Sequence, residues 1–469
     1  MAYSPTGRRT AAHRALAALG LTTIIVTGCA APGAVATPSP TAVPSQAAPS
    51  TSTGATSSAT PIASTAAVPS CGTDPVKLSA YVETISLLVP KLAEEFTNQY
   101  PNVTWDIKQD TFANGSANLP RLLAGDNPPD IARAAMLIDL AKDNLLKNLD
   151  PYAAAFGWDK WPQAQFEQVR INDQNKRGTG ALRAFGLDQS TVGVFYNKKL
   201  AAQIGMTQPP TTVDELDALL AKAKAANLQP IMQWNASTSG GGLAFPLQNL
   251  MAAYGDIQPI KDWVFQKDGA NIDTPSNLQA AQKLAEWIGK GYFPKDVNAI
   301  EYTDAAGRFG KGEGVFTFNG DWQNAGYDKD LPGNVGFFTF PNAVGMSAPL
   351  TFVIGEKSKH ADCAAFFFNW VLTNDKARAI DVAVGGSNPG GPADATVPAA
   401  AADSVTTQTL AAGAAVSAKN GGMDFVANAT SGIFFQSWTP ELQKLVGAKV
   451  TPDQLLKDVQ AAYTAELSK

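Results

Sequence analysis

Histidine and cysteine are scarce in this chain of 469 residues, which contains two histidines and three cysteines. Three cysteines are too few for a disulfide-dense scaffold or for a zinc module held by four thiolates. Two histidines, His13 and His360, leave little room for histidine-ligated metals or for catalysis in which histidine is the base. The composition therefore favours a protein without a metal site, and nothing in it requires a cofactor.

A strong net charge is also lacking, since 36 basic residues face 41 acidic ones and the formal net charge is -5. So mild a charge does not indicate a nucleic-acid partner. Residues 30–70 contain no charged residue and consist mostly of Ala, Ser, Thr and Pro. A segment of this kind cannot bury enough apolar surface to offset the entropy of ordering it. We expect residues 29–73 to form a disordered linker.

The N-terminal apolar run is shorter than the roughly 20 residues that a membrane-spanning helix needs. It extends from Ala15 to Val26 and follows three arginines, which is the pattern of a signal peptide over residues 1–28. It closes with Val26-Thr27-Gly28-Cys29, which resembles the lipobox of bacterial lipoproteins. The resemblance implies cleavage before Cys29 and a lipid on that cysteine, which would hold the body at the extracytoplasmic face of the cell membrane. The alternative is an ordinary signal peptide with an incidental cysteine.

The rest of the chain alternates between strand and helix patterns. Val76–Val82 alternates as a strand, Pro90–Gln99 has the spacing of an amphipathic helix, and Val103–Ile107 alternates again. A further helix is expected to begin at Pro120. The length allows two to four domains, and 45% of the residues are apolar, which is enough for a substantial core. The pattern predicts an α/β body with a mostly parallel sheet covered by helices.

Several stretches of the body carry motifs of one family. They are Phe96–Val103, Gly125–Ile131, Asn148–Tyr152, Val194–Leu200, Pro209–Leu216 and Phe309–Trp322. In this order they resemble the extracellular solute-binding proteins of ABC importers, and specifically the sugar-binding family that includes maltose-binding protein. The resemblance covers nearly the whole body, although no single motif in it is decisive.

The resemblance implies a two-lobed periplasmic-binding-protein fold of type II, with mixed, mostly parallel sheets flanked by helices and a hinge between the lobes. By the match, the first lobe comprises residues 74–187 plus 350–395, and the second comprises residues 188–349 plus 396–469. This chain departs from the family pattern at Arg133–Met136, where members of the family often have an aromatic or acidic residue. The resemblance therefore does not imply that the ligand is maltose.

The function implied by the resemblance is that of a membrane-anchored substrate-binding component of an ABC importer. Such a monomeric protein captures a small carbohydrate, here an oligosaccharide, in the cleft between its lobes and delivers it to the transmembrane subunits of the permease. It is not an enzyme. Three alternatives stay open at this point: a binding protein for a non-sugar solute, a sensor or adhesin with the same fold, and a secreted glycoside hydrolase, which would need two carboxylates roughly 5–10 Å apart.

A sugar site needs aromatic rings against the apolar ring faces and a few polar groups for the hydroxyls. Trp322 follows a buried strand, at the position where the family places a stacking tryptophan, and Asp321 beside it could accept hydroxyl bonds. Trp234 follows a short strand over Pro230–Met232. Because ligands of open α/β sheets bind beyond the strand ends, these residues are candidates for ligand contact. Their structural alternatives are a core tryptophan and a solvated acid in a turn.

Four further candidates complete the expected site. Tyr81 and Glu83 end the first strand, while the resemblance places Trp438 near the cleft and Asn388 in a loop whose backbone approaches the ligand. A core position is the alternative for Trp438, because Phe434 before it already has the character of a core residue.

The two remaining cysteines, Cys71 and Cys363, are expected to form a disulfide. Export to an oxidising compartment favours their pairing, and the match assigns both residues to the same lobe. Two separate thiols are the alternative, and Cα atoms more than about 7 Å apart would contradict the pairing.

Overall fold

The computed structural model describes residues 68–468 apart from 85, 240, 340–344 and 419–421. The chain divides into two units, Met1–Ser64 and Thr65–Lys469, and the fold described below belongs to the second unit. The expected signal peptide, Cys29 and most of the expected linker lie outside the described residues. Within the described part of the chain, no helix has both the length and the apolar character needed to cross a membrane.

The described chain begins with a parallel β-α-β unit. Strands β1 (Val76–Glu83) and β2 (Val103–Asp110) pair along their whole length, and helix α1 (Leu88–Gln99) connects them. The short strand β3 (Ile131–Arg133) pairs parallel to β1 on its other side. Helix α1 packs one face against this sheet, with the helical spacing of an amphipathic segment. Its buried residues are Leu88, Val89, Leu92, Ala93 and Phe96.

Helix α2 (Phe112–Ala124) begins eight residues before the start that the sequence predicts, so the expectation of a helix opening at Pro120 is wrong. The helix is capped by Thr111, whose hydroxyl accepts the backbone N–H of Asn114 at 3.3 Å. Pro120 lies inside the helix, where it removes one backbone donor. The run between Phe112 and Pro120 contains asparagine, glycine and serine, which are weak helix formers and conceal the helix in the sequence.

Two long strands run through the middle of the body. Strand β6 (Phe185–Asn197) pairs antiparallel with β9 (Gly345–Val353) through its first half, and with β7 (Phe316–Gly320) and β8 (Val335–Phe338) through its second half. The order of the sheet is β2-β1-β3-β9-β6-β7, with β8 attached to β6 and β10 attached to β9. The sheet is thus mixed, with parallel pairs at β1 and antiparallel pairs at β6.

The remaining elements complete the two lobes. The other strands are β4 (Arg170–Ile171), β5 (Ala181–Leu182) and β10 (Gly422–Met423). The other α-helices are α3 (Ile138–Lys142), α4 (Asp150–Phe156), α5 (Ala164–Glu167), α6 (Lys198–Gln203), α7 (Val213–Ala225), α8 (Ala244–Tyr254), α9 (Gln258–Val264), α10 (Pro275–Gly289), α11 (Tyr302–Gly310), α12 (Asn324–Asp330), α13 (Ala361–Thr373), α14 (Asp375–Ile380), α15 (Thr406–Ala418), α16 (Thr439–Val446) and α17 (Pro452–Leu467). Short 3-10 or π turns are η1 (Trp158–Lys160), η2 (Ser237–Ser239), η3 (Val297–Ala299), η4 (Asp321–Gln323), η5 (Asp381–Gly385), η6 (Val426–Ala429) and η7 (Ile433–Trp438).

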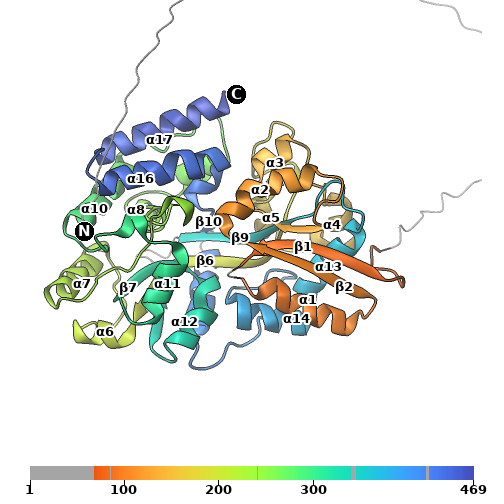
Figure 1. The fold of residues 1–469 in the computed structure, drawn as a ribbon, viewed down its shortest axis with the longest axis horizontal. Helices are drawn as coiled ribbons and strands as arrows, with labels where there is room; N and C mark the ends of the chain where they lie inside the picture. Colours follow the sequence, from red (N-terminus) through yellow and green to blue (C-terminus); the bar gives the residue numbers. More distant parts are fainter. Residues whose placement is uncertain (1–67, 85, 240, 340–344, 419–421, 469) are drawn as a thin grey trace, which may run out of the picture. The chain divides into compact units, whose positions relative to one another are not determined.

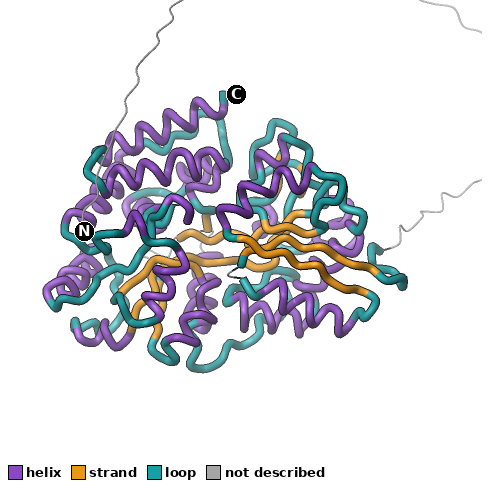
Figure 2. Tube along the Cα trace, viewed as in Figure 1, coloured by secondary structure: helices purple, strands orange, loops and turns teal. Residues whose placement is uncertain are grey.

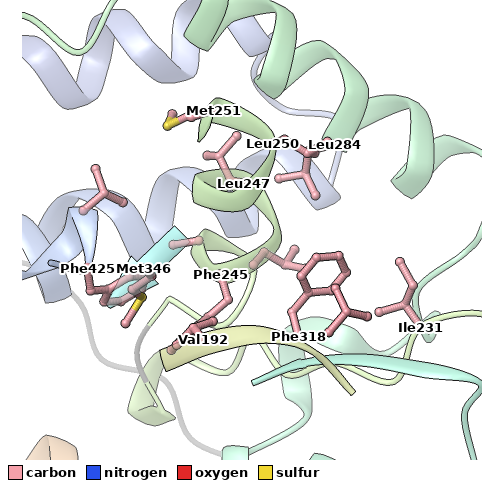
Figure 3. Close-up of a cluster of buried hydrophobic side chains, with 14 of the residues drawn as sticks. Val192, Ile231, Phe245, Leu247, Leu250, Met251, Leu284, Phe318, Met346 and Phe425 are labelled. Atoms are coloured by element: carbon pink, nitrogen blue, oxygen red, sulfur yellow. The ribbon is translucent and has the colours of Figure 1, made fainter. Parts of the chain in front are cut away.

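Each lobe has its own hydrophobic core. The first core lies around β1, β3 and α13, and the second lies around β7, α8, α10 and α17. In Figure 1 the elements of the first core lie on the right and those of the second core on the left, with β6 and β9 between them. The tube in Figure 2 shows the same strands passing from one group of helices to the other. Figure 3 shows Leu247 and Leu250 of α8 packed in the second core.

The two cysteines of the described chain form a disulfide. The Cα atoms of Cys71 and Cys363 are 4.2 Å apart, which agrees with the expected pairing. Cys363 lies in the first turn of α13, and both cysteines are part of the first core. The bond therefore attaches the start of the folded chain to a helix that follows it by 292 positions in the sequence.

Candidate functional site

A cavity of about 730 Å³ lies between the two lobes. Its lining comes from the loop after β1, the start of α2, the crossing strands β6 and β9, and the second lobe from Trp234 to Phe434. The volume falls within the range of roughly 300–1,000 Å³ that is usual for small-molecule sites. At one edge the lobes meet through Phe112 of α2 and Phe434, whose ring centroids are 5.4 Å apart.

The second lobe contributes a wall of aromatic rings, which we call the aromatic wall: Trp234, Phe245, Tyr302, Trp322 and Phe425. The indole N–H of Trp322 donates to the hydroxyl of Tyr302 at 2.8 Å, and Trp234 meets the Tyr302 ring edge-on at 4.8 Å. Phe245 and Phe425 stack at 4.6 Å. Figure 3 shows these two rings beside Met346 and Val192, which also line the cavity.

Trp322 is half-buried and lines the cavity, as the sequence predicts. Its indole ring lies directly over the backbone of Gly320 at the end of β7, where a Cβ atom would be 2.1 Å from the ring. Only glycine leaves room for this ring position. Trp234 also lines the cavity, although it is only 2% exposed, and its expected strand is reduced to a single bridge between Ile231 and Phe316.

The first lobe contributes a polar side. Glu83 and Arg133 both line the cavity, and the Arg133 Nε atom is 3.2 Å from the Glu83 Oε1 atom. Arg133 Nη1 also donates to the backbone carbonyl of Thr351 at 3.2 Å and to its hydroxyl at 3.0 Å. Tyr81 lines a small adjoining pocket that shares Glu83 and Arg133, and its hydroxyl donates to Asp110 at 2.8 Å. Glu83 is therefore at the cavity, and Tyr81 lies beside it.

A second arginine of the cavity is also paired. The Arg177 Nη1 atom lies 2.6 Å from the Asp424 Oδ2 atom, and both residues line the cavity. Because Arg133 and Arg177 each face a carboxylate, neither presents an uncompensated positive charge to a ligand. An anion that bound to either arginine would have to break its pair.

Three of the expected site residues do not line the cavity, and these expectations are corrected. Trp438 is fully buried in the second core, where its ring packs against Trp263 at 6.0 Å. Asn388 is not among the lining residues, and its Nδ2 atom donates to the carbonyl of Leu410 at 3.3 Å. Asp321 is fully buried too, and its carboxylate is occupied by protein donors.

Asp321 instead belongs to a cluster of three buried carboxyl groups, which we call the carboxyl cluster: Asp188, Asp321 and Asp381. They come from β6, from the turn η4 that directly follows β7, and from the turn η5, three segments at the crossing between the lobes. Asp321 accepts the backbone N–H of Thr191 at 2.7 Å and the hydroxyl of Ser387 at 2.8 Å. Asp188 lies where the register of β6 against β9 shifts, and it also borders the cavity.

Burial shifts the protonation of the carboxyl cluster. It raises the pKa of Asp188 to about 7, with Arg133 acting in the opposite direction. Burial and the neighbouring Asp188 raise the pKa of Asp321 well above its usual range. The pKa of Asp381 is likewise raised by burial and then by its two acidic neighbours, while Arg378 opposes the shift. In the described residues, no group of three or more His, Cys, Asp or Glu side chains is placed to hold a metal ion.

Sequence reasoning missed several residues of the cavity, among them Phe245, Tyr302, Phe425, Asp188 and Arg177. Tyr302 and Phe245 lie at the starts of α11 and α8, where helical spacing alone gives no reason to separate them from core residues. Arg133 could have been found from the sequence, because it lies where the chain departs from the family pattern. Phe425 follows a two-residue strand that no periodicity could predict.

A model of the family described as "Bacterial extracellular solute-binding protein" matches residues 84–378. A "Probable sugar-binding periplasmic protein" of Rhizobium meliloti (strain 1021) is 32% identical over 147 residues, which is 30% of this chain. The match spans only 34% of that relative's length.

Solved structures with the same fold cover nearly all of the body. A "Chitin oligosaccharide binding protein" has a TM-score of 0.70 at 20% identity, covering 84% of this chain and 100% of its own. A maltose-bound T. maritima protein has a TM-score of 0.67 at 17% identity, with 83% and 100% covered. A bacterial solute receptor described as preferring β-D-galactopyranose has a TM-score of 0.66 at 18% identity, with 84% and 100% covered. These likenesses confirm the two-lobed α/β fold. Since the family model also matches well over half of its residues, the chain belongs to the family of bacterial extracellular solute-binding proteins.

Proposed function

We propose that this protein is the substrate-binding component of an ABC importer, that it captures a neutral carbohydrate in the cavity between its lobes, and that it delivers the sugar to the transmembrane subunits of the permease. The observation that carries the proposal is the lining of the cavity. An aromatic wall from one lobe faces a polar side from the other, so a single ligand can contact both lobes and stabilise their closed arrangement.

The aromatic wall suits a sugar because sugar rings have apolar faces. Trp322 has an accessible ring, and its indole N–H is fixed by Tyr302, which holds the ring in one orientation. Opposite it, Glu83, Thr111 and Asn114 offer acceptors and donors at the cavity for hydroxyl groups. The volume of about 730 Å³ leaves room for more than one sugar ring, which supports an oligosaccharide.

The paired charges favour a neutral ligand over a charged solute. To use the buried charges, a phosphodiester would have to compete with Glu83 for Arg133, and a polyamine would have to compete with Arg177 for Asp424. Lys329 and Glu301, which also line the cavity, carry opposite charges. Breaking a buried pair by drawing away one partner leaves the other charge uncompensated, which is costly. The same argument disfavours a peptide as the ligand, but only because of the charges at its two termini.

The protein is proposed to act as a binding protein and not as an enzyme. A glycoside hydrolase needs two carboxyl groups that flank one bond. Of the acids that border the cavity, Glu83 faces Arg133 and Asp424 faces Arg177. Asp188 is 2% exposed, and the Glu301 carboxylate accepts the hydroxyl of Thr238. A set of chromogenic glycosides tests this point, and turnover of any of them by the purified protein would contradict it.

The membrane anchor and the division of the body into two lobes are proposed as the sequence predicts them. We propose a lipid on Cys29, a linker over residues 29–73, and a monomeric body at the outer face of the cell membrane. The lobes are proposed to be 74–187 plus 350–395 and 188–349 plus 396–469. This division is supported by the cores, because the first core lies within residues 71–187 and 352–377, and the second draws on 192–346 and 405–463 with two residues of the first segment.

A thermal-shift screen of the mature chain tests the sugar assignment. Chitooligosaccharides, xylooligosaccharides, maltooligosaccharides and galactose serve as probes, with a peptide, a polyamine and a phosphodiester as comparisons. A ligand that binds only the folded state at about 100 times its Kd stabilises it by about 2.7 kcal/mol, a readily measured shift. A shift with a charged solute, and none with any sugar, would overturn the proposal.

Replacing Trp322 by alanine is expected to weaken the binding of the sugar found in that screen about tenfold or more. The reason is the loss of one large stacking face, worth about 1–3 kcal/mol. Isothermal titration calorimetry measures the change, and Trp438→Phe is the matched control because that ring lies in the core away from the cavity. Equal affinity of Trp322→Ala and the unmodified protein would remove Trp322 from the site.

The substitution Gly320→Ala is expected to weaken sugar binding as Trp322→Ala does, although it replaces no side chain that lines the cavity. A Cβ at this position would be 2.1 Å from the Trp322 ring, so the ring must leave its place. Gly307→Ala in α11 is the control, because a Cβ there meets nothing within 4 Å, and it should gain about 0.5–1 kcal/mol of stability with unchanged affinity. Normal affinity in a folded Gly320→Ala variant would show that the ring position is not needed.

A further inference from the structure

The short hairpin formed by β4, β5 and the loop between them reaches from the first lobe to the second. We call residues 170–182 the hairpin arm. Its base belongs to the first core, in which Ile171 and Leu182 are buried. Its tip lies against Phe265, which is buried in the second core at the end of α9. The arm thus joins the two cores beside the crossing strand β9, to which Gln168 donates at the carbonyl of Ser347.

The tip fits closely against Phe265. The backbone N–H of Arg177 donates to the carbonyl of Phe265 at 3.3 Å, and the Arg177 guanidinium carbon lies 5.5 Å from the centroid of the Phe265 ring. Gly178 follows with a φ of +98°, and a Cβ there would be 2.9 Å from the same ring. Lys176 forms an ion pair with Asp268 at the surface. Arg177 and Gly178 at the tip therefore both suit its contact with Phe265.

Arg177 connects the two lobes through its side chain as well. Its Nε and Nη2 atoms donate to the carbonyl of Gln168 in the first lobe at 2.9 and 2.7 Å. Its Nη1 atom lies 2.6 Å from Asp424 Oδ2 in the second lobe, and the two side chains are only 1% and 7% exposed. The other oxygen of Asp424 accepts the backbone N–H of Phe425 at 2.7 Å and the side-chain amide of Asn428 at 3.0 Å.

This chain of contacts ends in the aromatic wall, because Phe425 stacks on Phe245 at the cavity. A buried ion pair seldom adds net stability over apolar residues of the same size, since removing both charges from water is costly. Its retention is better explained by the geometry that it fixes. The guanidinium makes two hydrogen bonds to the Gln168 carbonyl in one lobe and an ion pair with Asp424 in the other, so it holds these two groups at a fixed distance.

We propose that Arg177 is a positioning residue that clasps the lobes together and, through Asp424, holds Phe425 in the aromatic wall. The clasp fixes the angle at which both lobes line the cavity, and its meaning for sugar capture rests on the proposed function. Loss of the clasp is expected to widen the range of interlobe distances and to loosen the backbone at Phe425.

The test compares variants of the mature chain that separate positioning from folding. Arg177→Met alone leaves Asp424 buried without its partner and should lower the melting temperature markedly. The double variant Arg177→Met/Asp424→Asn removes both charges and should melt near the unmodified protein. Arg177→Lys keeps the charge without the planar fork and should give an intermediate result. Lys176→Met is the matched control in the same arm, because an exposed pair contributes little.

Two readouts that need no sugar then decide the proposal. Double electron–electron resonance measures the distance between two spin labels. The labels are attached to cysteines that replace Lys91 on α1 and Lys222 on α7, both exposed, in a Cys29→Ser background. Hydrogen exchange is followed in a peptide that covers Phe425. The double variant should show a broader distance distribution and exchange about tenfold faster at this peptide, with other peptides unchanged.

Unchanged distances and unchanged exchange in the folded double variant would overturn the proposal and leave Arg177 a structural residue only. Because neither readout involves a ligand, a failure of the sugar screen would not affect this result. A positive sugar screen would likewise not rescue the clasp.

Discussion

Replacing Asp381 by asparagine is expected to stabilise the protein at pH 8 and to reduce its loss of stability between pH 5 and pH 8. Asp381 lies in the carboxyl cluster, and neither of its oxygens has a hydrogen-bond partner among the described residues. Asparagine has the shape of the protonated carboxyl group and carries no charge. The substitution therefore removes repulsion from Asp188 and Asp321 without removing a hydrogen bond.

The sign of the pH effect follows from the raised pKa values. An unfolded aspartate titrates near pH 4, whereas Asp188 in the folded protein has a pKa of about 7 and the pKa of Asp381 lies well above its usual range. Between these limits the folded state holds protons that the unfolded state has released, so stability falls as pH rises. The stabilising contribution is complete below about pH 4 and is lost as pH rises through the folded pKa values. A tenfold difference in proton affinity between the folded and unfolded states corresponds to about 1.4 kcal/mol, so the total is on the order of a few kcal/mol.

Urea unfolding at pH 5 and pH 8 measures the effect. Asp394→Asn, an exposed residue of a loop, is the control and should leave both values unchanged. Arg378 faces Asp381 and partly offsets the repulsion, so Arg378→Met should steepen the pH dependence. If Asp381→Asn is less stable than the unmodified protein at pH 8, the cluster does not strain the fold in its ionised form.

Removal of the disulfide is expected to cost about 2–5 kcal/mol of stability. The bond closes a loop with a sequence separation of 292, and long loops restrict the unfolded chain most. Both cysteines are also buried in the first core, so alanine at Cys71 and Cys363 leaves small cavities as well. The urea midpoint of the double alanine variant should fall, and the unmodified protein with a reductant should behave in the same way.

Cys29→Ser is the control for this experiment, because it removes the third cysteine and leaves the disulfide intact. An unchanged midpoint after complete reduction, verified by thiol titration, would show that the bond adds nothing to the stability of the body.

Much of the fold can be predicted from the sequence because most elements carry their own signals. Helix α7 begins after Thr212, whose hydroxyl accepts the backbone N–H of Glu215 at 3.1 Å, and the sequence shows this capping box directly. The start of helix α2 is misplaced because its first two turns lack strong helix formers. Strand β6 is predictable only in its second half, since its first half is held by pairing with β9, a partner far away in the sequence.

The site is harder to predict because position relative to a strand end does not specify which way a side chain points. Trp322 and Trp234 are found through their strands, but the same reasoning misplaces Asp321, whose carboxylate turns inward to Thr191. Trp438 is assigned by resemblance and is a core residue. Phe425 and Arg177 depend on contacts between segments that are distant in the sequence, and no local pattern records such contacts.

The order of the strands also determines when each lobe can be completed. The first lobe's sheet includes β9, and its core includes α13, yet both follow most of the second lobe in the chain. Because the chain is made from its N-terminus onward, β1, α1 and β2 can form early, since the contacts among them are local. The edge of β3 stays open until β9 arrives, and an unpaired edge invites wrong partners. The second lobe waits as well, because its core includes α17, which follows both β9 and α13 in the chain. The part of the protein that is made first therefore stays incomplete until most of the chain has been made.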